Sequence, residues 1–276
     1  MLAPLAEAIS RRRIYRDLFE IGLVGVAFLL YFLVRGSVVD RDAEALGNAL
    51  DIIEVERAIG IYWEPDLHAA IIDYEALVQL FNAFYFWLDF PLIVGVGLGM
   101  YFFGRRHEYT VARDAVLASG AIALIVYNLF PVAPPRLLEP LAIELGNPAA
   151  AGAGFVDTVN EYTNFSYQAQ STQPFVNPYA AMPSLHYGWQ LLVGGVLFWT
   201  ARSVWLRALG VFMPVGQLSA IVFTANHYIL DAIGGLGVAL LGLLVAIALQ
   251  RWGYPAVRRL VERVPEPASS PAGPPG

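Results

Sequence analysis

Residues 227–250 read HYILDAIGGLGVALLGLLVAIALQ, and after Asp231 no charged residue interrupts them until Arg251. About 20 consecutive apolar residues are what an α-helix needs to cross a bilayer. Similar apolar runs occur near residues 18–35, 78–103, 111–131, 184–200 and 205–224. The sequence therefore predicts an all-α fold, a bundle of six transmembrane helices that includes the span near 227–250.

The composition favours a membrane protein and excludes several chemistries. The chain is 57% hydrophobic and 14% charged, and it contains no cysteine. Disulfides, thiolate nucleophiles and cysteine metal sites are thus excluded, and a net charge of −6 argues against a nucleic-acid partner. All basic residues are arginine, and Ala, Gly and Pro are abundant, which is typical of a GC-rich bacterial genome.

The arginines predict the orientation, because cytoplasmic loops near membrane ends collect positive charge. One side of six alternating spans carries Arg11, Arg12, Arg13, Arg16, Arg105, Arg106, Arg113, Arg202, Arg207, Arg251, Arg258, Arg259 and Arg263, and the other carries only Arg35, Arg41, Arg57 and Arg136. Both termini are therefore expected in the cytoplasm, in a multi-pass protein of the bacterial inner membrane.

Residues 1–263 are predicted to form a single integral membrane catalytic domain. Residues 264–276, rich in Pro, Gly and Ser, are expected to be a disordered cytoplasmic tail. Apolar positions at helical spacing within residues 41–75 predict amphipathic surface helices on the non-cytoplasmic side. A packing role and a substrate role for these helices are about equally favoured. The long loop 132–182 leads into the residues that carry chemistry.

Two histidines are expected to meet at the non-cytoplasmic surface. His186 follows Pro183-Ser184, and His227 lies 41 residues later. At 1.5 Å per helical residue this separation corresponds to about two membrane crossings. Arg136, just beyond the third span, is expected at the same face.

The residues around these histidines suit a phosphate. His227 and Asp231 lie four apart on a helix, so the carboxylate can orient the imidazole as a base or nucleophile. Pro183 is expected in the first turn of the fourth span, which would put Ser184 at the amino end of that helix. The amino ends of the fourth and sixth spans attract anions, and Arg136 offers a fork of donors to phosphate oxygens.

These motifs resemble those of the type-2 phosphatidic acid phosphatase superfamily, especially its inositolphosphotransferase branch, which contains fungal inositol phosphorylceramide synthase. The resemblance covers roughly residues 75–250. It implies that His227 forms a phosphohistidine, that Asp231 orients it and that His186 protonates the leaving oxygen. It further implies that Arg136 and Ser184 hold phosphate oxygens. A lipid phosphate would be the substrate, with water or an alcohol or polyol as acceptor, and neither a metal nor another cofactor would be needed.

The chain departs from the phosphatase branch at two places. Leu129 stands where that branch has a lysine, and Ala220 and Ile221 stand where it has a Ser-Arg pair. Fewer cations would hold the phosphate, which favours a phosphodiester substrate and the transferase branch. Hydrolysis and transfer stay open, because water can replace an alcohol acceptor in the second step.

Three other functions would use some of the same residues. His186, His227 and Asp231 could ligate zinc, but Arg136 would oppose a cation there and no HExxH-type pair is present. A rhomboid-type intramembrane serine protease would use Ser184 and His227, yet the glycines that such enzymes need around the serine are absent. A non-enzymatic transporter or scaffold would leave the whole constellation unexplained.

Further polar residues are candidates for lining the substrate site. Asn82, Tyr85 and Asp89 form a polar stripe in the second span, where a carboxylate is costly unless paired. Asp89 could contact a polyol head group, partner Arg136, or join helices. The residues flanking the motifs are Asn128, Tyr179, Tyr187 and Tyr228. The glycines of Gly95-x-x-x-Gly99 and Gly234, Gly235 and Gly237 predict close helix packing.

Overall fold

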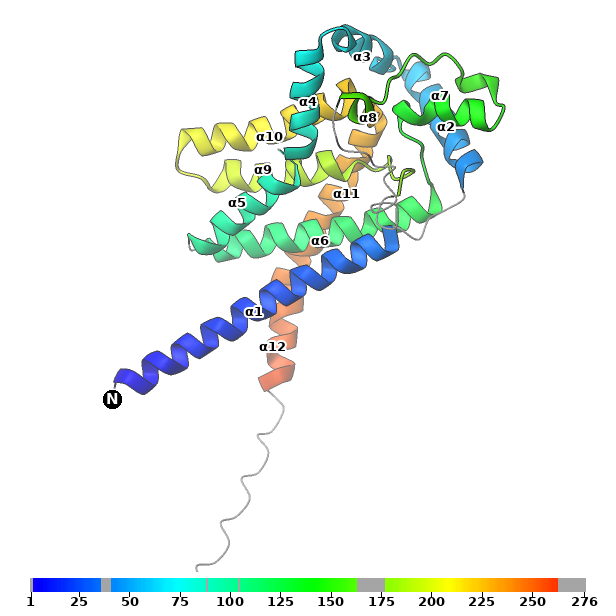
Figure 1. The fold of residues 1–276 in the computed structure, drawn as a ribbon. Coiled ribbons are helices and arrows are strands. Elements are labelled where there is room, and N and C mark those ends of the chain that lie inside the picture. Colours follow the sequence, from blue (N-terminus) through cyan, green and yellow to red (C-terminus); the bar gives the residue numbers. More distant parts are fainter. Residues whose placement is uncertain (1, 36–40, 88, 104, 163–176, 263–276) are drawn as a thin grey trace, which may run out of the picture.

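The computed structural model describes residues 2–35, 41–87, 89–103, 105–162 and 177–262, and the regular elements there are helices (Figure 1). The α-helices are α1 (Leu2–Arg35), α2 (Asp42–Ile59), α3 (Glu64–Ile72), α4 (Glu75–Trp87), α5 (Phe90–Phe102), α6 (Arg106–Leu129), α7 (Leu138–Glu144), α8 (Thr158–Tyr162), α9 (Leu185–Thr200), α10 (Val204–Phe223), α11 (Ile229–Ala248) and α12 (Tyr254–Glu262). A π-helical turn, Leu249–Gly253, joins α11 to α12. The predicted all-α class is confirmed.

Three of the described helices are long and apolar enough to cross a membrane: α6, α10 and the continuous stretch Ile229–Leu260. A fourth span results if α4 and α5, bent by 43° at a break between them, are counted together. The chain is therefore a multi-pass membrane protein. The count of six spans and the sidedness of the bundle stay predictions. The predicted tail, residues 264–276, lies outside the described residues.

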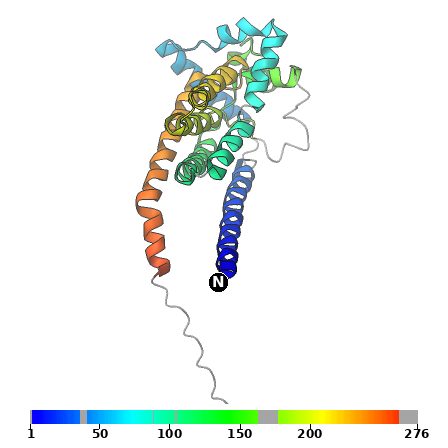
Figure 2. The same cartoon turned by 90° about the vertical axis from the view of Figure 1, so that its left-hand side faces the viewer.

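Helices α6, α9, α10 and α11 form the packed centre. Figure 1 shows α6, α9 and α10 side by side, and Figure 2 shows them nearly end-on while α11 runs steeply across them. Gly235 of α11 permits the close crossing with α9, because a Cβ there would lie 2.3 Å from the Ser184 carbonyl oxygen. The close packing predicted for Gly235 is thus confirmed, and it brings the beginnings of α9 and α11 together.

The glycines of α5 do not show the close helix packing that was predicted for them. Within the described chain, a Cβ built on Gly95 would meet no atom within 4 Å, and one on Gly99 would only touch the Phe103 ring at 4.0 Å. Close helix packing at Gly95-x-x-x-Gly99 was therefore a wrong prediction. The missing side chains leave open space along α5.

The helices predicted within residues 41–75 are present as α2 and α3. Helix α2 buries Ala45, Leu46, Ala49 and Ile53 against α7 and the start of the loop that follows α6. The buried His68 of α3 pins two other segments, since its Nδ1 lies 2.8 Å from the Phe223 carbonyl oxygen and its Nε2 accepts from Val156 N at 3.1 Å. Burial lowers the pKa of His68, which favours the neutral ring whose Nε2 accepts a hydrogen bond. These helices thus form one layer over the end of α10 and the beginning of α11.

Candidate active site

His227 lies in the tight turn between α10 and α11. Ala225 takes a left-handed conformation, φ 55°, which few residues with a Cβ adopt. The turn lets both Asn226 N and His227 N donate to the Ile221 carbonyl oxygen at 3.0 Å. His227 is consequently held against the bundle, and its residue is 4% exposed.

Asp231 is fully buried beneath His227. His227 Nδ1 lies 3.2 Å from Asp231 Oδ2, and the same oxygen accepts from Tyr228 N at 2.9 Å. The carboxylate therefore has a fixed position before any ligand arrives. With the imidazole proton on Nδ1, where it faces this acceptor, Nε2 carries the free electron pair.

His186 stands opposite His227. The centroids of the two rings are 5.6 Å apart, although His186 belongs to α9 and His227 to the turn between α10 and α11. His186 Nδ1 lies 2.6 Å from Asp89 Oδ2, a close contact that is not aligned as a linear hydrogen bond. Its Nε2 is 3.1 Å from the Tyr85 hydroxyl. Each histidine therefore has its own carboxylate.

Asp89 reaches His186 because the α4–α5 pair is broken. It is the residue before α5, and Tyr85 lies one turn earlier on α4. Of the roles that the sequence allowed for Asp89, pairing with Arg136 is not what the structure shows. Its partner in the described chain is His186.

Ser184 connects the two histidine segments. It caps the beginning of α9, with Oγ 3.4 Å from Tyr187 N, and its own N–H donates to the Asp231 carbonyl oxygen at 2.8 Å. Pro183 precedes this cap, so its predicted place in the first helical turn was wrong by two positions. The hydroxyl still lies at the amino end of α9, as predicted.

Arg136 is bound to the segment that carries His227. Its backbone N–H donates to the Ala225 carbonyl oxygen at 2.9 Å, and its Nε donates to Asn226 Oδ1 at 2.8 Å. Nη1 makes a longer contact of 3.4 Å with Asp157 Oδ2. Sequence reasoning missed Asn226 and Asp157, because neither belongs to a recognisable pattern. The arginine is 11% exposed and is oriented without a ligand.

Comparisons with known proteins show the family of this chain. A family model described as the PAP2 superfamily matches residues 50–245. The chain belongs to the PAP2 superfamily. A relative from Bacteroides thetaiotaomicron named phosphoinositol dihydroceramide synthase is 28% identical over 176 residues, which are 61% of this chain and 55% of the relative. The chain thus spans about half the length of that relative. No solved structure matches.

Both similarities point to the family that the motifs indicated, and the relative's name is that of a synthase of an inositol-containing lipid. The resemblance expected from the motifs is confirmed. Among the described residues, no three His, Asp or Glu side chains converge as metal ligands. A zinc site built from His186, His227 and Asp231 therefore has no support in the geometry.

Most of the other predicted lining residues of this PAP2 chain have partners elsewhere. Asn82 is engaged at both amide atoms with Thr158, which ties α4 to α8. The Tyr179 hydroxyl donates to Asp42, and the Tyr228 hydroxyl donates to the Ala133 carbonyl oxygen at 3.2 Å.

The remaining predicted lining residues differ in their surroundings. Asn128 is exposed and donates to the Leu124 carbonyl oxygen. Tyr187, partly buried, packs against the apolar cluster that contains Tyr85 and Ala220. Tyr85 and Asp89 are thus the predicted lining residues whose side chains contact His186.

Two buried glutamates that sequence reasoning missed close the beginning of α11. Glu64 Oε1 accepts from Ile229 N and Glu56 Oε1 accepts from Leu230 N, both at 2.7 Å. Both residues are 0% exposed. Burial raises the pKa of Glu56 to about 9 and also raises the pKa of Glu64. The predicted anion site at the amino end of the sixth span is therefore not available, because carboxyl groups already occupy those N–H donors.

The raised pKa of Glu56 predicts a pH-dependent stability. The unfolded chain ionises Glu56 near 4.5 and the folded chain near 9, so its contribution is complete below pH 4.5 and is lost as pH rises toward 9. We expect the melting temperature of the wild-type protein to fall over that range. Glu56→Gln should flatten the curve, because an amide oxygen accepts from Leu230 N without ionising.

Two further variants make this measurement specific. Glu56→Ala should lower the melting temperature at every pH, since a buried N–H group without an acceptor costs about 1–3 kcal/mol. Glu54→Gln removes an exposed carboxylate from the same helix and should reproduce the wild-type curve. Equal pH curves for Glu54→Gln and Glu56→Gln would contradict the prediction.

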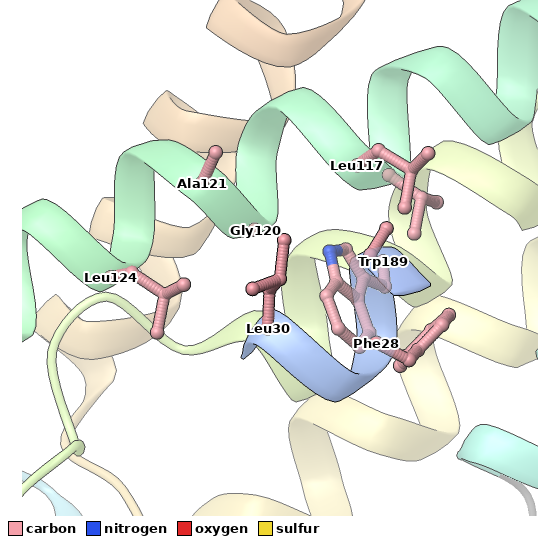
Figure 3. A pocket seen from close by; sticks show the side chains of 9 residues that line it. Phe28, Leu30, Leu117, Gly120, Ala121, Leu124 and Trp189 are labelled. Carbon is pink, nitrogen blue, oxygen red and sulfur yellow. The ribbon is translucent and has the colours of Figure 1, made fainter. Parts of the chain in front are cut away.

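An apolar cavity of about 220 Å³ lies beside the helical turn that follows His186 (Figure 3). Trp189 of α9 forms one wall, and its Nε1 donates to Ser119 Oγ at 3.1 Å. Phe28 and Leu30 of α1 and Leu124 of α6 form others. An alkyl chain would find only apolar side chains here.

Proposed function

We propose that the protein transfers the phosphoryl-type group of a lipid phosphate ester or phosphodiester through a phosphohistidine on His227. Nε2 of His227 attacks phosphorus, and the bond from phosphorus to the lipid alcohol oxygen breaks. His186 Nε2 donates its proton to that departing oxygen, at the place where the Tyr85 hydroxyl now lies. Water or an alcohol then loses a proton to His186 and attacks the phosphohistidine, which frees His227.

The observation that carries this proposal is the pair of opposed histidines, each beside a carboxylate. Two similar groups in different surroundings suit a nucleophile and an acid. Asp231 supports the cation that forms on His227 during attack, and Asp89 supports protonated His186 before the first step and after the second. Arg136 and the Ser184 hydroxyl are placed to hold non-bridging oxygens, a role that Arg performs well through its forked donors.

Several features support a lipid phosphodiester and a polyol or other alcohol acceptor. Leu129, Ala220 and Ile221 replace cationic or polar residues of the phosphatase branch, so a phosphate with one less charge fits better. The relative named phosphoinositol dihydroceramide synthase points the same way. The lipid tail would use the apolar cavity beside Trp189. We place the site at the non-cytoplasmic face of the bacterial inner membrane, with both termini in the cytoplasm.

The alternative functions have no specific observation in their favour. Ser184 Oγ has Tyr187 N as its partner, and in the described chain it makes no hydrogen bond to a histidine as a serine protease would require. A transporter or scaffold would not need two opposed pairs of histidine and carboxylate.

The test is an assay of the purified full-length protein in lipid with phosphatidate, polyprenyl pyrophosphate and phosphatidylinositol. We expect turnover of at least one of them, unchanged by EDTA, because the proposed steps use only side chains. Orthovanadate should inhibit, since its five-coordinate form imitates attack on phosphorus. Loss of activity with EDTA, or labelling of Ser184 by a fluorophosphonate, would contradict the mechanism.

A further inference from the structure

A separate groove of about 560 Å³ lies between α5, the turn joining α9 to α10, and the beginning of α6. Most of the side chains that line it are apolar, among them Leu92, Val96 and Leu197. Volumes between about 300 and 1,000 Å³ are typical of sites for small molecules. The groove is therefore large enough for a specific ligand.

Two glycines of α5 create much of this space. Gly95 and Gly99 line the groove, and a Cβ on Gly95 would have no neighbour within 4 Å. Two alkyl-sized side chains are thus missing from a helix face that is otherwise apolar. The groove therefore runs along α5, as an acyl chain does when it lies beside a membrane helix.

Cationic and hydroxyl groups surround one end of the groove. Arg105 and Arg202 both line it, together with Ser203 and Thr200. Arg202 is exposed and makes no ion pair within the described chain, and the described ion pair of Arg105 is a 3.8 Å contact to Glu108. Ser203 caps α10 without a side-chain hydrogen bond. The polar end therefore presents two cations whose charge is poorly neutralised.

This end is remote from the catalytic candidates. His186 is near the beginning of α9, and Thr200 is its last residue, which places them about 20 Å apart at 1.5 Å per residue. Figure 1 shows the α9–α10 turn and the end of α5 on the side away from α8 and the beginning of α11. The groove is thus not part of the reaction site.

We propose that this groove binds one anionic phospholipid, with an acyl chain along Gly95 and Gly99 and the head-group phosphate between Arg105 and Arg202. The two arginines favour an anionic head group. A basic pocket between membrane helices attracts anionic head groups, whereas a zwitterionic lipid brings a cation that the two arginines repel. The bound lipid would be a resident of the opposite membrane leaflet from the substrate.

The test is a binding titration of the full-length protein in detergent with phosphatidylglycerol and phosphatidylcholine of identical acyl chains, read by native mass spectrometry. Wild type should prefer phosphatidylglycerol. Arg105→Gln with Arg202→Gln should reduce that preference by about 10- to 30-fold, at about fivefold per arginine. Arg251→Gln with Arg258→Gln removes the same charge outside the groove and should keep the preference.

A second variant tests the apolar half. Gly95→Leu should fill the groove without disturbing a neighbour, so binding of phosphatidylglycerol should fall while the melting temperature is kept. Equal affinity of wild type for the two lipids would overturn the proposal. So would equal losses in the two double variants, or unaltered binding by Gly95→Leu. None of these readouts depends on turnover, so they are independent of the proposed reaction.

Discussion

His227→Ala is expected to abolish both steps of the reaction, because the variant has no nitrogen that can attack phosphorus. The loss in kcat should be at least about 10³-fold, as is usual for removal of a covalent nucleophile. The expected loss applies to every substrate, whatever its leaving group. A phosphoenzyme should be trapped by rapid acid-free quenching of wild type with a ³²P-labelled lipid, and the variant should give none.

His107→Ala is the matched control for this substitution. His107 is exposed near the beginning of α6 and lies outside the site, so its loss should change neither turnover nor labelling. Stability must be compared as well, because His227 is buried. A labelled His227→Ala protein, or one that keeps a tenth of wild-type turnover, would rule out His227 as the nucleophile.

His186→Gln should show a loss that depends on the leaving group. A lipid alcohol is a poor leaving group and needs a proton, so turnover of the lipid should fall by about 10²- to 10⁴-fold. p-Nitrophenol leaves as a stable anion, so hydrolysis of a p-nitrophenyl phosphate ester should fall by less than about 10-fold if the first step limits it. His227→Ala, in contrast, should lose both activities equally.

Asp89→Asn makes this experiment sharper. The amide keeps the size of the carboxylate that lies 2.6 Å from His186 Nδ1 but removes its charge. Its effect should follow the same dependence on leaving group, with a smaller loss than for His186→Gln. Equal losses of the lipid and p-nitrophenyl activities in His186→Gln would show that His186 binds phosphate instead of donating a proton.

Much of this architecture could be predicted from local patterns. Apolar runs were enough to place α6 and α10 within a few residues, and helical spacing in residues 41–59 was enough to predict α2. The break between α4 and α5 was missed because both halves are apolar and form one continuous run, although Asp89 and Pro91 mark the interruption. The opposite behaviour of Gly95 and Gly235 was hidden for a related reason, since a glycine permits close contact but does not require it.

The candidate site, too, was predictable only in part. By itself the sequence determined which groups are available, because a spacing of four residues pairs His227 with Asp231 and Ser184 lies where a helix begins. The predicted shared helical face was wrong, since His227 lies in the turn before α11 while Asp231 lies within the helix. Which carboxylate serves His186, and which groups occupy the amino end of α11, only the tertiary structure decided. Asp89, Glu56 and Glu64 lie far along the chain from the groups they touch. Such contacts depend on the directions in which packed helices enter the site, and local spacing carries no information about those directions.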